Sequence, residues 1–221
     1  MVAPAPIRTD TFAELHEQLG FVPLDRIGLK PPPGAATEAD VIRYQEGEPK
    51  RLFELVDGVL LEKTMGSRES FLAGSIIMAF GYYLKSRNLG IVTAPDGLYR
   101  MLTQNVRMPD VTFTPWANLP GRRMPKTKVW GVVPGLAVEV LSEANTVQEM
   151  ERKLVEYQTL GIAVIWIIDP ESETAKVYRL DGTVQSLSPA DSLTAESVLP
   201  GFSLSLAELF AEPMPPDEDL L

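Results

Sequence analysis

The sequence predicts an α/β fold in which a mixed central β-sheet is flanked by helices on both faces, with an extra helical segment at the N-terminus. The first basis for this prediction is the order of the hydrophobic patterns. Helix, antiparallel strands, helix and strand follow one another, which is typical of a sheet covered by helices on both sides. The second is size, because 221 residues with 45% hydrophobic content can bury a full core in a single domain with extensions.

The N-terminal segment is expected to be an addition to this domain. A short amphipathic helix at residues 10–19 is followed by Pro31-Pro-Pro-Gly34, which cannot continue a helix and indicates an extended connector. Thr37 then caps a second helix, from residue 38 to about residue 45, with acidic residues in its first turn. The chain is thereby divided into an N-terminal helix with its proline-rich connector, a main domain, and an acidic, proline-rich tail that is expected to be disordered, at residues 1–36, 37–211 and 212–221.

A β-hairpin is predicted at residues 52–64, because Asp57-Gly58 stands between two apolar runs and this dipeptide is a strong signal for a two-residue turn. A long helix with a wide apolar face follows at residues 69–86. The later elements are expected to be strands, apart from one helix at residues 147–161. These strands cover residues 90–93, 98–101, 106–113, 136–141, 163–168 and 175–178.

Lys153 is the most informative residue of the chain, because it carries a charge within the apolar stripe of the predicted helix at residues 147–161. The apolar residues of that stripe, spaced by three and four positions as on one face of a helix, are Val147, Met150, Leu154 and Tyr157. Arg152 is expected on the opposite, solvated side. Two interpretations of Lys153 stay open: its stem packs in the core while the ammonium reaches water, or the ammonium serves a buried site.

Three carboxylates indicate what such a site would hold. Glu54, Asp110 and Glu139 each lie within an apolar run that is predicted to be a strand, and a glutamate is almost never fully buried without a partner or a metal. The chain has no cysteine, which excludes thiolate ligands and leaves oxygen ligands that select Mg²⁺ or Mn²⁺ over zinc. Together with Lys153, the three carboxylates predict a divalent-metal site with an amine beside it.

These residues lie in a series of five short segments that resembles the Uma2 family, also called DUF820, a branch of the PD-(D/E)XK nuclease superfamily. In chain order the segments are Phe53-Glu-Leu-Val-Asp-Gly58, Arg107-Met-Pro-Asp110-Val, Ala137-Val-Glu-Val-Leu-Ser142, Arg152-Lys-Leu-Val-Glu-Tyr157 and Val164-Ile-Trp166-Ile-Ile-Asp-Pro170. They span most of the chain, and their order is more specific than any one of them. In the parent superfamily the lysine lies two residues after the glutamate, where this chain has Leu141. In the Uma2 branch it lies on the following helix, which is the place of Lys153.

The resemblance implies a restriction-endonuclease-like core and a Mg²⁺- or Mn²⁺-dependent endonuclease whose DNA products carry 5′-phosphate and 3′-hydroxyl ends. In that mechanism Asp110, Glu139 and the carbonyl of Val140 would hold the ion. Glu54 would bind a water on the ion or a second ion. Lys153 would orient or deprotonate the attacking water, and deprotonation requires that burial or a nearby cation lowers its pKa.

Two further residues bear on this mechanism. Tyr157 lies on the same side of its helix as Lys153, and we expect it to be a core residue rather than a hydrogen-bonding group of the site. Many Uma2 sequences carry a histidine at the start of the helix after the first hairpin, where this chain has Glu69-Ser70. The only histidine of the sequence is His16, in the N-terminal segment, so a histidine-dependent mechanism is not expected.

The formal net charge of −10, from 20 basic and 30 acidic residues, is unusual for a protein that binds nucleic acid, because such binding relies on clustered lysine and arginine. One loop, at residues 119–128, nevertheless holds four cations within seven positions. We expect these cations either to contact nucleic-acid phosphates or to belong to an ordinary solvated loop. They are Arg122, Arg123, Lys126 and Lys128.

The sequence contains no run of eighteen apolar residues and no cleavable signal pattern, which predicts a cytoplasmic protein without membrane association. The expected partner is nucleic acid, with DNA taken from the resemblance. RNA as the substrate, the cleavage specificity and the oligomeric state, including a homodimer, stay open. Two other functions are weighed: a non-catalytic nucleic-acid-binding module on the same fold, and an interaction protein whose acidic surface binds a basic partner. The nuclease is preferred because it accounts for the retained lysine and for carboxylates in apolar strands.

Overall fold

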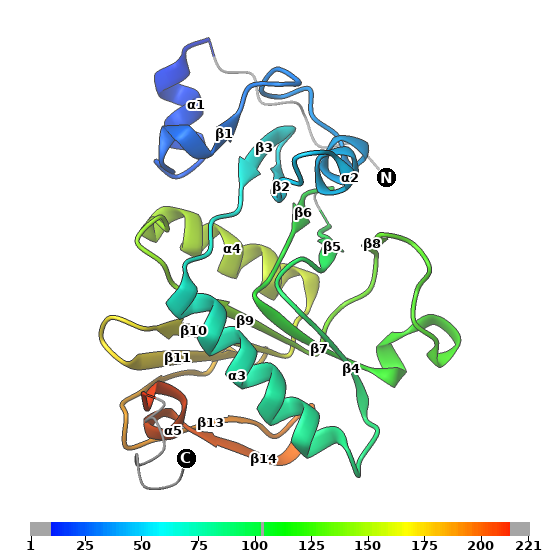
Figure 1. The fold of residues 1–221 in the computed structure, drawn as a ribbon, viewed down its shortest axis with the longest axis vertical. Coiled ribbons are helices and arrows are strands. Elements are labelled where there is room, and N and C mark those ends of the chain that lie inside the picture. Colours follow the sequence, from blue (N-terminus) through cyan, green and yellow to red (C-terminus); the bar gives the residue numbers. More distant parts are fainter. Residues whose placement is uncertain (1–9, 103, 213–221) are drawn as a thin grey trace, which may run out of the picture.

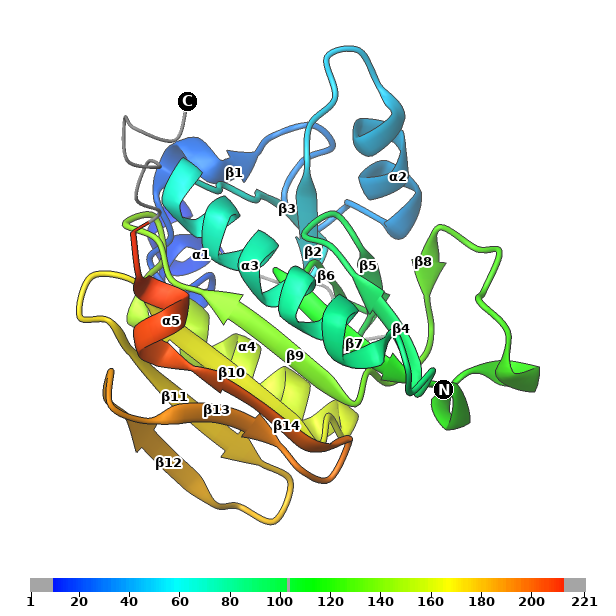
Figure 2. The ribbon, with the colours of Figure 1, turned by 60° about the horizontal axis from the view of Figure 1, so that its bottom comes forward.

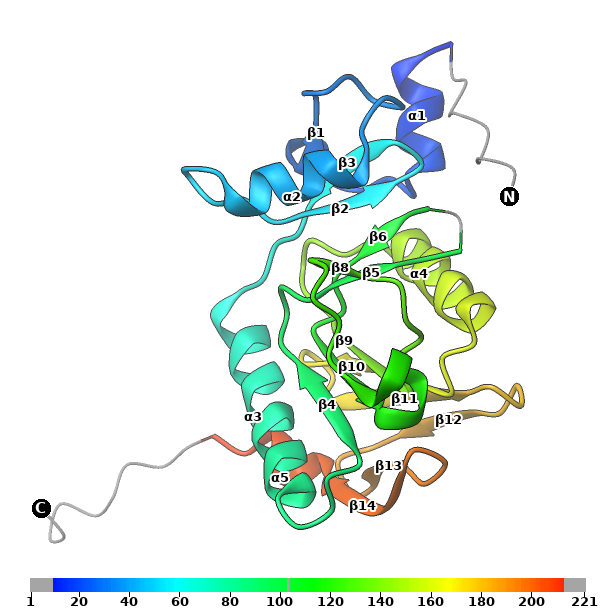
Figure 3. The same ribbon diagram turned by 90° about the vertical axis from the view of Figure 1, so that its right-hand side faces the viewer.

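The computed structural model describes residues 10–102 and 104–212. A six-stranded central sheet is covered by α3 (Ser67–Leu84) on one face and by α4 (Val147–Leu160) on the other. Figures 1 and 3 show a second six-stranded sheet at one end of the molecule and a two-stranded ribbon at the other. The predicted mixed sheet between helical layers is confirmed, although the strands form two large sheets rather than one.

The central sheet contains the one parallel pair that makes it mixed. Its strands are β4 (Gly90–Thr93), β7 (Val111–Pro115), β9 (Leu136–Val140), β10 (Val164–Asp169), β11 (Thr174–Arg179) and β12 (Val184–Leu187). They lie in the order β12-β11-β10-β9-β7-β4, and β9 is parallel to β10 while the other neighbours are antiparallel. A parallel pair needs a long crossover connection, and α4 provides it on the far side of β9 and β10 in Figure 2.

Alternation along β9 determines where its carboxylate points. Every second residue from Leu136 to Val140 packs with α3 in the main hydrophobic core, so Ala137 and Glu139 face the opposite side, toward α4. Ala137 joins a smaller core there that includes Tyr157 of α4. Because all five residues of β9 are buried, the strand has a nearly continuous apolar sequence with a single carboxylate in it.

The second sheet is built around the predicted hairpin. Its strands are β1 (Ile27–Gly28), β2 (Phe53–Val56), β3 (Val59–Glu62), β5 (Leu98–Arg100), β6 (Val106–Arg107) and β8 (Val129–Trp130), in the order β1-β3-β2-β6-β5-β8. Asp57 and Gly58 have φ angles of 49° and 78°, as a two-residue turn with left-handed residues requires. A Cβ on Gly58 would lie 2.7 Å from the backbone of Gly34, so the turn also needs glycine for space.

The predicted single strand at residues 106–113 is wrong, because this run is divided between the two sheets. Its first part is β6 of the second sheet and its last part belongs to β7 of the central sheet. Pro109 lies in the connection between them, where it donates no backbone hydrogen bond to a ladder. The division places Asp110 directly before β7, at the junction of the two sheets.

The N-terminal segment joins the second sheet. After α1 (Phe12–Gln18) and a 3₁₀ turn (Leu24–Arg26), β1 pairs with β3. The predicted capped helix is α2 (Glu38–Glu46), and the Thr37 N–H donates to Asp40 Oδ2 at 2.9 Å.

Toward the C-terminus, the sequence patterns predicted no element after residue 178. The structure has β12 of the central sheet there, followed by β13 (Ser192–Ala195), β14 (Leu199–Ser205) and α5 (Leu206–Phe210). The acidic tail lies outside the described residues, apart from residue 212. Among the described helices, none combines the length and the apolar character that crossing a membrane requires.

Candidate active site

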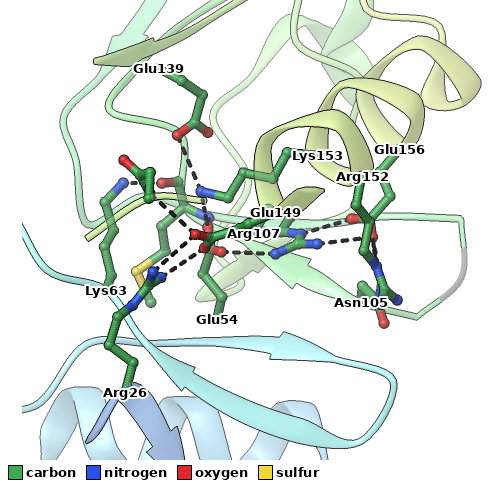
Figure 4. A network of polar contacts seen from close by, with 12 residues as sticks. Arg26, Glu54, Lys63, Asn105, Arg107, Glu139, Glu149, Arg152, Lys153 and Glu156 are labelled. Carbon is green, nitrogen blue, oxygen red and sulfur yellow. Dashed lines mark hydrogen bonds and ion pairs between the residues drawn. The ribbon is translucent and has the colours of Figure 1, made fainter. Parts of the chain in front are cut away.

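A buried lysine lies between carboxylates from the two large sheets (Figure 4). Nζ of Lys153, in α4, is 3.2 Å from Oε1 of Glu54 in β2 and 3.2 Å from Oε2 of Glu139 in β9. Lys153, Glu54 and Glu139 are 3%, 1% and 4% exposed, respectively. The interpretation in which the ammonium reaches water is therefore wrong, and Lys153 belongs to a buried charge cluster.

The buried face of α4 is its charged face rather than the apolar stripe expected from the sequence. Its buried residues are spaced by four positions and are Glu149, Lys153 and Tyr157. Val147, which was assigned to the apolar stripe, is 69% exposed. The spacing of apolar residues predicted the wrong buried face, because the strands opposite this part of α4 place carboxylates beside Lys153.

Tyr157 is both a core residue and a hydrogen-bonding group of the site. Its ring is buried in the core beside Ala137 and Ile165, as expected. Its hydroxyl donates a hydrogen bond of 2.5 Å to Oε1 of Glu139, so the exclusion of Tyr157 from the site is wrong. The hydroxyl and the Lys153 ammonium thus hold the two oxygens of one carboxylate.

Asp110 is fixed by a backbone group and a second lysine. The Val140 N–H donates to Oδ2 of Asp110 at 2.7 Å, and the Asp110 N–H donates to the carbonyl of Val138 at 2.9 Å. Nζ of Lys63 lies 2.7 Å from Oδ1 of Asp110. Sequence reasoning missed Lys63, which directly follows the last residue of β3, because nothing in its neighbourhood separates it from a solvated lysine.

Glu54 is held by a buried arginine in addition to Lys153. Nη1 of Arg107 is 2.9 Å from Oε2 of Glu54, and the Met108 N–H donates to Oε1 at 3.0 Å. Arg107 is 1% exposed and also pairs with Glu156 at 2.7 Å. Sequence reasoning missed Arg107 as well, although a charge within the apolar run of residues 106–113 is the same kind of signal that identified Glu139.

The N-terminal segment contributes a third buried cation. Arg26 donates two hydrogen bonds to Glu149 of α4, at 2.9 and 2.7 Å, and a further one to the carbonyl of Glu62 at 2.9 Å. Burial raises the pKa of Glu149, but the bond from Arg26 and the charge of Lys153 outweigh it and lower that pKa. The start of α4, one turn before Lys153, is therefore fastened to the N-terminal segment by an ion pair.

Arg152 does not have the solvated position that was predicted for it. Its guanidinium pairs with Asp57 in the hairpin turn and with Glu156 one helical turn later. It also donates to the carbonyl of Gln18 at 3.0 Å. Arg152 thus extends the charge network of Figure 4 toward the surface, and its replacement would not be a neutral control for that of Lys153.

Burial and charge act in opposite directions on the pKa values of the cluster. Burial raises the pKa of Glu54, but the charges of Lys153 and Arg107 outweigh it and hold that pKa well below its usual value. Burial raises the pKa of Glu139; Lys153 opposes this effect and nearby Asp110 reinforces it. Burial lowers the pKa of Lys153, yet the two glutamates raise it above its usual value. Lys153 is therefore a charged donor, which favours orienting a water over deprotonating it.

The donors of the cluster suit a hard divalent cation in kind, because they are carboxylates with the backbone carbonyl of Val140 beside them. Each carboxylate oxygen of Asp110 and Glu139 already has a partner, and these partners are Lys63, the Val140 N–H, Tyr157 and Lys153. The cavity lined by Asp110, Glu139 and the two lysines measures about 10 Å³, which is room for about one water. Within residues 10–102 and 104–212, no three histidine, cysteine or acidic side chains are grouped as a ready metal site. An ion would therefore have to take the place of an ammonium.

The four cations of the basic loop are exposed and lie apart from the carboxylates. The loop leads into β8, the edge strand of the second sheet, whereas Glu54 lies in β2, which β6 and β5 separate from β8. In Figure 1 the loop projects at the right-hand edge. Lys128 pairs with Glu46 of α2. The structure thus brings the predicted ligands and Lys153 together but does not bring the loop cations to them.

Comparisons with known proteins bear on the family and the fold of this chain. The model of the Uma2 family, described as "Putative restriction endonuclease", matches residues 38–207. A crystal structure of a "putative nuclease belonging to DUF820" from Anabaena variabilis ATCC 29413 is similar, with a TM-score of 0.67 and 19% sequence identity over 79% of this chain and 97% of that one. At that identity the similarity shows the fold alone. No curated protein sequence matches the chain.

The family match covers the greater part of the chain, from α2 to the start of α5. It includes Glu54, Lys63, Asp110, Glu139 and Lys153, whereas Arg26 lies before it. Family model, fold and the buried lysine–carboxylate cluster are consistent with one another, and the chain is accordingly a member of the Uma2 family.

Proposed function

We propose that this protein is a metal-dependent endonuclease that hydrolyses phosphodiester bonds in DNA and leaves 5′-phosphate and 3′-hydroxyl ends. The observation that carries the proposal is the position of Lys153, buried between Glu54 and Glu139 and lining the same cavity as Asp110. Three carboxylates in the interior are costly unless they are neutralised. Their presence next to a lysine therefore points to a chemical role, and the family is described as "Putative restriction endonuclease".

Phosphodiester hydrolysis needs an activated water, neutralisation of the charge that develops on the phosphate, and help for the leaving alkoxide. Asp110, Glu139 and the carbonyl of Val140 would hold a Mg²⁺ or Mn²⁺ ion. When bound, such an ion would supply the activation of water and the neutralisation of charge. Glu54 would contact a water on that ion.

Lys153 would orient the attacking water by donating a hydrogen bond to it. Its ammonium is aimed by two carboxylates at equal distances of 3.2 Å, which restricts its position. Arg107 and the Met108 N–H in turn hold Glu54, and Tyr157 holds Glu139. The order required for catalysis is thus supplied by groups that are themselves fixed by burial and hydrogen bonds.

Nucleic acid would reach the protein from solution, and we place this activity in the cytoplasm. The exposed cations of residues 122–128 would contact phosphates at a distance from the cluster, since an acidic chain needs a local basic surface for such binding. A homodimer is the assembly to be tested, because two copies could cut both strands of a duplex.

A non-catalytic nucleic-acid-binding module on the same fold is the second candidate. The observation that favours it is that the four oxygens of Asp110 and Glu139 already have partners. Such a module would bind DNA without cleaving it and would need no divalent ion. Calorimetric titration with Mg²⁺ and Mn²⁺ separates the two candidates, since only the nuclease requires an ion that binds at these residues.

Nicking of supercoiled plasmid in the presence of Mn²⁺ tests the proposal directly. Asp110→Asn and Glu139→Gln should abolish nicking, whereas the matched control Asp181→Asn, on an exposed residue of the β11–β12 turn, should retain it. Ligation of the products without prior phosphorylation would report 5′-phosphate ends. Equal nicking by the wild type and Asp110→Asn would assign the activity to a contaminating nuclease.

A further inference from the structure

Lys63 belongs to the cluster, but neither the family resemblance nor the proposed reaction assigns it a role. Its ammonium lies 2.7 Å from Oδ1 of Asp110 and also donates to the carbonyl of Met108. The two side chains of this ion pair are 8% and 5% exposed. Because Oδ2 of Asp110 is bound by the Val140 N–H, Oδ1 is the oxygen that an incoming cation would take, and Lys63 covers it.

The charge balance of the cavity allows either Lys63 or an ion, but not both. Glu54, Asp110 and Glu139 carry three negative charges, and Lys63 and Lys153 carry two positive ones. Three arginines, Arg26, Arg107 and Arg152, surround this group together with three further carboxylates, Glu149, Glu156 and Asp57, so they leave its net charge unchanged, although Arg107 also contacts Glu54. A divalent ion added to the intact cluster would turn a net negative charge into a net positive one in a buried place, which is costly. If one ammonium leaves as the ion enters, the three negative charges are balanced by one remaining ammonium and the two charges of the ion.

Of the two lysines, Lys63 is the one placed to leave. Lys153 is held by two carboxylates at once and is 4% exposed along its side chain. Lys63 has one carboxylate partner, and it stands in the segment between β3 and α3, where the neighbouring Thr64 and Gly66 are exposed. Its flexible four-carbon stem can therefore move the ammonium from Asp110 into solvent.

We infer that Lys63 is the internal counterion of the metal site: it neutralises Asp110 in the absence of a divalent ion and competes with that ion for Oδ1. This inference rests on the proposed function, because it presupposes that an ion binds at Asp110 and Glu139. Lys63 then weakens metal binding while it stabilises the metal-free protein. The same competition makes it a residue that sets the metal concentration at which the site is filled.

The inference predicts opposite effects of Lys63→Met on the two states. Methionine keeps most of the volume of the stem but removes the charge. The metal-free variant should melt at a lower temperature than the wild type, because Asp110 is left buried without its ion-pair partner. Its affinity for Mn²⁺ should rise by about tenfold or more, because the ion no longer has to displace the Lys63 ammonium from Asp110. Breaking a buried ion pair commonly costs more free energy than a tenfold change in an equilibrium constant, which is about one pKa unit.

Calorimetric titration of the full-length protein with Mn²⁺ and Mg²⁺ measures this effect without reference to cleavage. The matched control is Lys50→Met, because Lys50 also pairs with an aspartate, Asp96 at 3.2 Å, but on the surface with both side chains about half exposed. Tighter binding in Lys63→Met, together with unchanged binding in Lys50→Met, supports the inference. Equal or weaker binding in Lys63→Met overturns it and leaves the proposed function in place. No binding by either the wild type or Lys63→Met overturns both.

A second measurement applies if Lys63→Met does not fold. The side-chain ammonium resonance of Lys63 in the wild-type protein can be assigned by its loss in Lys63→Arg, which keeps the charge. It should shift on addition of Mg²⁺ with the same midpoint as the heat of binding. A resonance that does not move while Mg²⁺ binds would show that Lys63 stays on Asp110, and would overturn the inference.

Discussion

Replacement of Lys153 by methionine should reduce stability strongly, because it leaves two buried carboxylates without their shared counterion. Breaking a buried ion pair by removing one partner costs about 3–5 kcal/mol. Glu54 keeps Arg107 and the Met108 N–H, whereas the hydrogen-bond partner that Glu139 keeps among the described residues is the Tyr157 hydroxyl. The loss therefore falls mainly on Glu139, and we expect a decrease of about 3 kcal/mol in the free energy of unfolding. A domain of typical stability, about 5–15 kcal/mol, would stay folded.

The double variant Lys153→Met/Glu139→Gln separates this cause from a loss of packing. Glutamine keeps the shape of Glu139 without its charge, so the double variant should be more stable than the sum of the single effects predicts. Residues in direct contact typically show coupling of about 0.5–3 kcal/mol, and the upper half of that range is expected here because both groups are buried. Urea denaturation of the four proteins of the cycle measures the coupling directly.

The pH dependence of Lys153→Met follows from the raised pKa of Glu139. Lys153 opposes that rise, so its removal should raise the pKa of Glu139 further. A carboxyl with a raised folded-state pKa favours folding below its unfolded pKa, about 4.3 for a glutamate, and this contribution is lost as the pH rises through the folded value. The destabilisation should therefore be larger at pH 7 than at about pH 4.5.

Lys50→Met is the control for a lysine–carboxylate pair on the surface, which contributes about 0–1 kcal/mol. Nicking by Lys153→Met should be absent under conditions where circular dichroism shows that the variant is folded, because methionine cannot donate to a water. A loss of stability below about 1 kcal/mol, without coupling to Glu139, would show that the Lys153 ammonium reaches solvent. That result would refute both the buried cluster and the proposed role of Lys153 in hydrolysis.

The remaining predictions concern other parts of the molecule. Mg²⁺ or Mn²⁺ at millimolar concentration should raise the melting temperature of the wild type but not that of Asp110→Asn or Glu139→Gln, as scanning fluorimetry can show, because an ion that binds only the folded state stabilises it by mass action. Neutralisation of the four cations of residues 122–128 should weaken DNA binding and flatten its salt dependence in an anisotropy series, and an unchanged slope would make the loop a bystander. Arg26→Met, which leaves a buried carboxylate unpaired, should lower the free energy of unfolding by about 3 kcal/mol in urea. The pKa of Glu54 is lowered, so the stability it contributes is present above about pH 4.3 and is lost as the pH falls further; acid titration should show a smaller loss for Glu54→Gln.

Elements whose formation depends on nearby residues of the sequence were predicted well. The hairpin at Asp57-Gly58 depends on two left-handed residues in the turn, and the end of α4 on Gly161, whose φ of 90° suits glycine. The helix expected at residues 69–86 is α3, two residues earlier at both ends. Pro109 could be seen in the sequence as well, but the break that it makes between two strands depends on a second sheet, which local patterns do not reveal. The apolar run around it therefore appeared to be one strand.

The prediction of which face of α4 is buried failed for a physical reason that applies to buried charge clusters in general. Periodicity assigns the buried face to apolar residues, since burial of an unpaired charge is costly. In α4 the cost for Glu149 and Lys153 is offset by Arg26, Glu54 and Glu139, which lie at distant positions in the sequence. A pattern computed along one helix carries no information about such partners.

A charge inside an apolar strand run nevertheless indicates that a partner exists, even where it does not say which one. Glu54 and Glu139 were identified in this way, and the same rule applied to Arg107 would have found the residue that fixes Glu54. Lys63 carries no such signal, because it follows a strand instead of lying within one, and its role depends entirely on where the chain places it beside Asp110. The sequence thus specifies the carboxylates and the lysine that the structure brings together, whereas Lys63, the counterion that we propose to compete with a metal, emerges only from the fold.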